Sequence, residues 1–301
     1  MATKKKLMPR KTAAKKKVAK KALAKKLSVK KTAARAPAQK ATTAARPTKV
    51  TKASARTFVT TARLPAAPKG PKRRDITLPS FDEATTQAAV VGSGVLSFTA
   101  GVPAQKREDL CNATLLAQLA ANRKVPDRTN IMPWFDAYFG ALMQLGWSVQ
   151  QSGFREYTGE IDGLETHQAV RNVAAVLLGP SPAALAVLLS TLDAMQSMHR
   201  DSPWITIFDR EHRDSKSTHF QIGLADQLPN GGLVMHLMAF SLETSAKITQ
   251  VLFFKLKKKK VRLQQNAGQA IVDVGVLTSV RAALKKRLAD HVTDFIATVE
   301  I

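Results

Sequence analysis

The positive charge of this chain is confined to its first 74 residues. That segment carries 18 lysines and 7 arginines and no acidic residue, whereas the remaining 227 residues contain 22 basic and 22 acidic side chains. The net charge of +25 therefore belongs to the first segment alone. The sequence predicts a cationic arm, residues 1–74, attached to an electrically neutral body, residues 75–301, and it excludes a uniformly basic domain.

The arm lacks the apolar residues that a core needs. It has 18 alanines and a single aromatic residue, Phe58. With so little apolar surface to bury, the arm cannot offset the conformational entropy that folding costs. We expect residues 1–74 to be disordered when unbound, with the prolines from Pro37 onward making the second half an extended linker.

Lysines stand in runs along the first half of the arm, and the densest run is KKKVAKKALAKK at 15–26. This run resembles the Lys/Ala-rich tails of linker histones and of the bacterial histone H1-like proteins. The likeness is one of composition, and the arm lacks the Ser-Pro-Lys-Lys repeats common in such tails. The resemblance implies sequence-independent binding to duplex phosphates through twelve lysines: Lys4, Lys5, Lys6, Lys15, Lys16, Lys17, Lys20, Lys21, Lys25, Lys26, Lys30 and Lys31.

The chemistry of lysine points the same way. Its ammonium group is a compact charge that contacts a phosphate and releases condensed counterions. Base readout needs side chains held rigidly in a groove, which a flexible arm does not provide. We therefore expect binding to the phosphate backbone of DNA or RNA without sequence preference.

Two smaller basic clusters complete the predicted nucleic-acid interface. One is Lys72, Arg73 and Arg74 at the end of the arm, which also fits a targeting signal. The other lies in the body, where Phe253 points outward on the same expected strand and could stack on a base. Its members are Lys257, Lys258, Lys259 and Lys260. The alternative interpretation of this second cluster is a charged hairpin that discourages edge-to-edge strand pairing.

The body has a helical first half and a strand-rich second half. Apolar residues recur at helical spacing in five segments: 103–122, 133–145, 164–178, 182–198 and 272–288. β-prone or alternating residues mark six others: 90–98, 147–157, 204–208, 217–225, 233–242 and 248–256. The sequence predicts the α+β class, with helices packed on one face of an antiparallel β-sheet and the disordered basic arm in front.

An uncharged stretch, Asn172 to Leu192, has 21 residues, close to the length of about 20 that crosses a bilayer. Pro180 and Pro182 would break a spanning helix, so the sequence favours two buried helices joined by a turn. The alternative is a helical hairpin that inserts into a membrane after a conformational change. That alternative suits a secreted or injected effector or toxin, in which the arm is a targeting or loading signal and the body acts on membranes or host targets.

Residues that could carry catalysis or a metal are isolated. Cys111, the one cysteine, excludes an intramolecular disulfide and a multi-thiolate metal site, and its place on an apolar helix indicates a buried, inert thiol. His212 lies in the polar segment 209–214 and His219 follows it; that segment could hold a metal or an acid–base pair, but its alternating charges favour a solvated loop. No phosphate-binding glycine loop, G-x-S-x-G or H-E-x-x-H motif is present. The sequence predicts no catalytic residue, metal site or cofactor, and favours a non-enzymatic function without excluding an enzyme.

The predicted function is non-specific nucleic-acid binding by a cytoplasmic protein associated with a nucleoid or with chromatin, whose body has another interaction role. No apolar signal segment follows the basic N-terminus, so classical secretion is not expected. The alternative is the effector, exported by a non-classical route, with an anionic membrane or a secretion apparatus as its partner. The oligomeric state stays open.

Overall fold

The computed structural model describes residues 49–68, 80–127, 129–150, 153–199, 201–210, 212, 215–257 and 260–301, without the side chains of 299 and 300. The chain divides into two units, Met1–Pro47 and Thr48–Ile301, and every described residue belongs to the second. We expected residues 1–74 to be disordered. Of these, residues 1–48 and 69–74 lie outside the described ranges.

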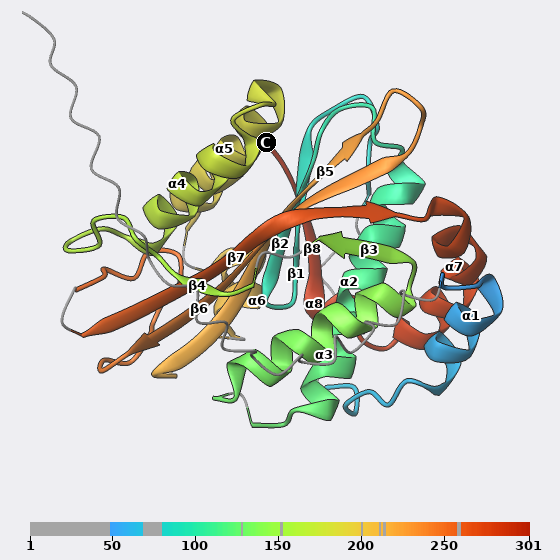
Figure 1. Cartoon of the computed structure of the whole chain (residues 1–301), viewed down its shortest axis with the longest axis horizontal. Coiled ribbons are helices and arrows are strands. Elements are labelled where there is room, and N and C mark those ends of the chain that lie inside the picture. Colours follow the sequence, from blue (N-terminus) through green and yellow to red (C-terminus); the bar gives the residue numbers. More distant parts are fainter. Residues whose placement is uncertain are drawn as a thin grey trace, which may run out of the picture. The chain divides into compact units, whose positions relative to one another are not determined.

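Helices and a single sheet make up the second unit (Figure 1). Its helices are α1 Lys52–Thr61, α2 Ala104–Lys124, α3 Ile131–Gln144, α4 Thr166–Leu178, α5 Pro182–Ser197, α6 Pro203–Arg210, α7 Val274–Leu288 and α8 Val292–Phe295. Its strands are β1 Gln87–Val91, β2 Gly94–Phe98, β3 Trp147–Gln150, β4 Arg155–Glu156, β5 Ser217–Gln227, β6 Leu233–Thr244, β7 Val261–Val272 and β8 Ile296–Glu300. The predicted α+β class is confirmed.

The strands follow the order β3-β7-β6-β5-β2-β1-β8, and β4 pairs with β7 beside β3. All pairs are antiparallel except β2–β5, which is parallel, so the sheet is mixed. The segment expected as one strand at 90–98 is a hairpin instead. Gly92 forms its turn at a φ of 52°, and a side chain there would meet Gln118 Oε1, 2.2 Å from an added Cβ.

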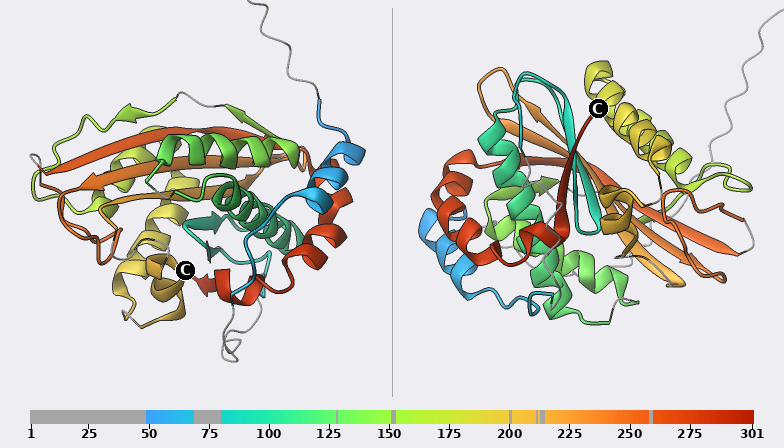
Figure 2. Two further views of the ribbon diagram at one scale, coloured as in Figure 1. Left: turned by 90° about the horizontal axis from the view of Figure 1, so that it is seen from below. Right: turned by 180° about the vertical axis from the view of Figure 1, so that it is seen from behind.

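The two faces of the sheet bury separate hydrophobic clusters. Successive strand residues point to opposite faces, and in β1 Ala89 and Val91 join one cluster while Ala88 and Val90 join the other. Helices α1, α2, α3 and α7 pack on the first face, and α4, α5 and α6 on the second (Figure 1, Figure 2). The expectation that helices cover one face only is wrong. Strands such as β1 and β2 are buried throughout, and strands of that kind need cover on both sides.

Helix α1 lies inside the segment that we expected to be a disordered linker. Thr51 and Ser54 form a capping box at its start, and Ala55 and Val59 are fully buried. The helix runs beside α7 in the same direction. Two contacts show this: Arg56 Nε donates to Ser279 O at 3.2 Å, and further along both helices Arg287 Nη2 donates to Ala62 O at 2.7 Å. Phe58 packs on the same core and Ala62 is buried as well, and the compact unit extends at its N-terminal side to Thr48.

The segment 204–208, expected as a strand, is helix α6. Its β-branched and aromatic residues indicate a strand, yet the buried ones are Trp204, Ile205, Ile207 and Phe208, which is helical spacing. Ser202 Oγ accepts from Ile205 N at 3.3 Å and Pro203 follows at the first helical position, a pair of start signals.

One further expected strand is wrong, and one observed strand was not expected. Segment 248–256 forms only an isolated bridge, Lys255 to Glu165, and its carbonyls accept from the first backbone N–H groups of α4: Thr166 N donates to Phe254 O and His167 N to Leu252 O. Strand β7 instead runs the full length of β6, although its centre is polar and carries no strand signal.

Candidate functional site

The predicted nucleic-acid-binding residues fall mostly outside the described ranges. These are the twelve predicted contact lysines between Lys4 and Lys31, with Lys72, Arg73, Arg74, Lys258 and Lys259. Lys257 and Lys260 are described, and both are exposed on the connection that leads into β7. Arg262, just beyond them, pairs with Glu156, with Nε 3.0 Å from Oε1.

Phe253 does not point outward from a strand, because segment 248–256 forms no strand. Its side chain is half-buried against the α4–α6 cluster, and its ring centroid lies 5.6 Å from that of His167. Base stacking by Phe253 stays a prediction.

The residues singled out for chemistry are held in structural roles. Cys111 is 1% exposed, and burial raises the pKa of its thiol well above the usual range, which keeps it protonated. Asp209 and His212 are buried too, so the solvated loop expected over 209–214 is wrong for these two. His212 Nδ1 lies 2.6 Å from Thr218 Oγ1. Within the described ranges, no three His, Cys, Asp or Glu side chains gather as a metal site would need.

Two other histidines have a consequence for stability. Burial lowers the pKa of His167, which Glu165 partly opposes, and burial lowers the pKa of His236, which Asp226 partly opposes. Because both pKa values are below the ordinary value of about 6.5, the folded chain takes up fewer protons than the unfolded chain as the pH falls. The stabilisation that these two histidines contribute is therefore complete above about pH 6.5 and is lost progressively as the pH falls from there toward their lowered pKa values.

Replacing His236 with glutamine is expected to flatten the acid side of the stability profile. Each proton bound only by the unfolded chain lowers the free energy of unfolding by about 1.4 kcal/mol for each pH unit of acidification. Between pH 7 and 5 the urea midpoint of the H236Q variant should therefore fall less than that of the parent. H199Q is the matched control, since the His199 side chain is 81% exposed. Parallel pH profiles for H236Q and the parent would contradict the prediction.

The uncharged stretch Asn172–Leu192 forms a hairpin of α4 and α5 on the sheet (Figure 1). Arg171 and Asp193, the charged residues that flank the stretch, pair across the two helices. The inner faces are buried, with Val170, Ala174, Leu188 and Leu192 between 0 and 1% exposed, as the sequence predicts for two buried helices. Among the helices the structure describes, none combines the length and apolarity of a membrane span.

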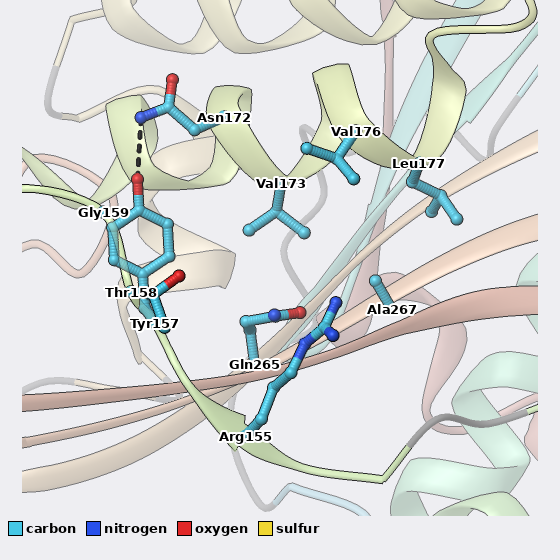
Figure 3. Close-up of a pocket in the computed structure, with 10 residues that line it drawn as sticks. All are labelled: Arg155, Tyr157, Thr158, Gly159, Asn172, Val173, Val176, Leu177, Gln265 and Ala267. Atoms are coloured by element: carbon cyan, nitrogen blue, oxygen red, sulfur yellow. Dashed lines mark hydrogen bonds between the residues drawn. The ribbon is translucent and has the colours of Figure 1, made fainter. Parts of the chain in front are cut away.

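A pocket with a volume of about 640 Å³ lies between α4 and the neighbouring strands (Figure 3). One wall is the segment that begins at Arg155 on β4 and continues through Tyr157 and Gly159. The opposite wall is the second half of α4, and β7 supplies the floor. The lining residues are Arg155, Tyr157, Thr158, Gly159, Asn172, Val173, Val176, Leu177, Gln265 and Ala267.

The strand register places the two central polar groups of this pocket together. Arg155 is the direct antiparallel partner of Gln265, so both side chains project from the same face of the sheet (Figure 3). Gln265 is 7% exposed, and its Oε1 is buried without a hydrogen-bond partner. Within the described part of the chain, Arg155 has no ion pair or hydrogen bond through its guanidinium.

Tyr157 closes one end of the pocket. Its hydroxyl accepts from Asn172 Nδ2 at 2.7 Å, which joins the β4 segment to α4. Gly159 allows this position, because a Cβ there would lie 2.4 Å from the Tyr157 hydroxyl oxygen. Sequence reasoning missed the pocket, since β4 has only two residues and its partner stands more than a hundred residues later.

No family model matches this chain, and no curated protein matches it. One solved structure, titled delta-endotoxin, is similar over 70% of this chain and 91% of that chain, at 12% identity and a TM-score of 0.31. The structure of the Evf virulence factor is similar over 74% of this chain and 84% of that chain, at 10% identity and a TM-score of 0.27. Both TM-scores are too low to bear on the function of this protein.

Proposed function

We propose that this protein binds nucleic acid without sequence preference, through the phosphate backbone and by means of its cationic arm. The observation that carries the proposal is the separation of charge: 25 basic residues and no acid in the first 74, and equal numbers of both in the rest. An unbalanced lysine-rich segment is attracted to a polyanion by counterion release, with dissociation constants of about 10⁻⁴–10⁻⁶ M at physiological salt.

The surface where the arm joins the body supports this proposal. Lys49, Lys52, Arg56 and Arg63 belong to the cationic segment and are exposed on and beside α1. They stand next to the end of α7, where Arg287 contacts Ala62 O. Lys285 in the same turn is paired with Glu108 at 2.8 Å, whereas Lys286 adds a further exposed charge. The positive charge of the arm thus continues onto the described unit and would extend a phosphate-contacting surface.

The test compares the full chain with a variant that starts at Thr48. This boundary keeps α1, whose buried residues belong to the first core. The full chain is expected to retard unrelated DNA duplexes equally in an electrophoretic assay. The truncated variant keeps Lys49, Lys52, Arg56 and Arg63 but lacks the twelve predicted contact lysines, so it is expected to retard them far more weakly. Equal retardation by both chains would contradict a role for the arm, and a preference for one duplex sequence would contradict non-specific binding.

The second candidate is the effector whose body acts on a membrane. The observation that favours it is the α4–α5 hairpin, which carries no charge between Arg171 and Asp193 and exposes Val176 to 80% near its tip. Release of a trapped dye from anionic liposomes by the variant that starts at Thr48 would support this function. In that case the arm would serve as a targeting or loading signal.

A further inference from the structure

The pocket between α4, β4 and β7 is asymmetric in its chemistry. Among the described residues that line it, Arg155 is the only charged side chain, and the amide nitrogen of Gln265 and the Tyr157 hydroxyl, whose oxygen already accepts from Asn172, are further donors. No aspartate or glutamate is among the described residues that line it. A site with one cation, several donors and no acid favours an acceptor-rich anionic group.

The other side of the pocket is aliphatic. Val173, Val176 and Leu177 on α4 face Ala267 on β7 across the cavity (Figure 3). Val176 is 80% exposed, an unusual place for a large apolar side chain of a helix that otherwise buries its apolar face. An apolar group bound in the cavity would cover Val176 and remove that surface from water.

Gln265 offers the pocket both a donor, Nε2, and an acceptor, Oε1. Oε1 is one of several buried polar atoms without a hydrogen-bond partner in the described part of the chain, and as an acceptor it is satisfied only by a donor, whereas Nε2 suits an anionic oxygen. Neither atom of this amide has a partner in the part of the chain that is described, although Arg155 projects beside it. An anionic group that accepts from both the Arg155 guanidinium and Gln265 Nε2 would satisfy these two donors at once, and Oε1 would need a donor elsewhere on the ligand.

We propose that this pocket binds a small amphipathic anion. Its carboxylate, sulfonate or phosphate group lies against Arg155 and Gln265, and its apolar part lies against Val173, Val176 and Leu177. The volume of about 640 Å³ is within the range of roughly 300–1,000 Å³ that is usual for small-molecule sites. None of the described residues that line the site belongs to the arm, so the site would give the body a function that does not depend on nucleic-acid binding.

The probe for this site is 8-anilinonaphthalene-1-sulfonate, an aromatic sulfonate whose fluorescence rises in an apolar environment. The full chain is titrated as the parent, as R155Q and as R262Q. Arg262 is the matched control: it lies on β7 three residues from Gln265, so its side chain projects from the opposite face, where it pairs with Glu156. R155Q is expected to weaken binding about tenfold, the usual size of one lost charged hydrogen bond. R262Q is expected to bind as the parent does, and the arm is the same in all three chains.

A second pair of variants keeps the test valid if R155Q does not fold. Val176 is so exposed that substitution there leaves the core intact. V176D places a negative charge at the rim and is expected to weaken binding of the sulfonate about tenfold relative to V176N, which is polar and neutral. Unchanged affinity in both R155Q and V176D would overturn the proposal. Displacement of the probe by 2-naphthamide as readily as by 2-naphthoate would overturn the requirement for an anion.

Discussion

Replacement of Arg107 by methionine is expected to lower the free energy of unfolding by about 3–5 kcal/mol, a large part of the stability of most domains. Arg107 on α2 is fully buried. Its guanidinium donates to Val102 O at 2.8 Å, Thr85 O at 2.9 Å and Thr99 O at 3.0 Å, and to Gln87 Oε1 at 2.8 Å. Burial lowers the pKa of Arg107, and Asp82 and Glu83 oppose that shift, so the side chain stays charged.

The loss would come from the acceptors and not from the cation. Methionine fills part of the space, but it leaves Val102 O and Thr85 O without a donor, each at a cost of about 1–3 kcal/mol before the chain relaxes. It also removes one of two donors from Gln87 Oε1 and from Thr99 O, which keep Asp82 N and Val102 N. R56M is the control, because Arg56 is exposed and makes one backbone contact, to Ser279 O. Urea unfolding followed by tryptophan fluorescence should give a midpoint far below the parent for R107M and close to it for R56M. Similar midpoints for the two variants would show that the carbonyl cluster does not need its cation.

Arg107 illustrates what the sequence does not disclose. Helix α2 was predicted from residues such as Leu110 and Leu116, which recur at helical spacing, and that prediction is confirmed. Spacing assigns Arg107 to a polar surface, yet α2 is buried almost all round between the sheet and its neighbouring helices. The carbonyls that Arg107 binds belong to the segments before β1 and after β2, and only the tertiary fold brings them together.

The strands show the same division between local and distant causes. β5 and β6 follow an apolar pattern and a Pro-Asn-Gly-Gly turn, so local sequence was sufficient to predict them. β7 is polar at its centre, from Gln264 to Asn266, and exists because β6 offers it twelve register positions and β3 and β4 cover its other edge. The pocket could not be predicted for the same reason. Arg155 and Gln265 come together only through the pairing of β4 with β7, and the sequence does not reveal that register.

The affinity of the full chain for duplex DNA is expected to fall by about 10³–10⁵ between 50 and 200 mM salt. That range corresponds to about six to ten phosphates neutralised at once, each adding about −0.9 to the slope of log affinity against log salt. The first half of the arm contains thirteen lysines, twelve of which are the predicted phosphate contacts. Fluorescence anisotropy of a labelled duplex, repeated across the salt range, measures the slope. On single-stranded DNA the slope should be shallower, at about −0.7 per phosphate neutralised. A flat salt profile would exclude counterion release as the source of binding.

Changes to three lysines at a time distinguish a polyelectrolyte from a shaped interface. If Lys15, Lys16 and Lys17 act only through charge, their replacement by glutamine should reduce the slope by up to about 2.7, the value for three phosphate contacts. The same change at Lys25, Lys26 and Lys30 should have the same effect, because in a segment without fixed geometry every lysine contributes equally to the salt slope. Replacement of either triplet by arginine keeps the charge and should leave the slope unchanged. A loss of binding confined to one triplet would mean that the arm presents a specific structure to its partner, which composition alone does not explain.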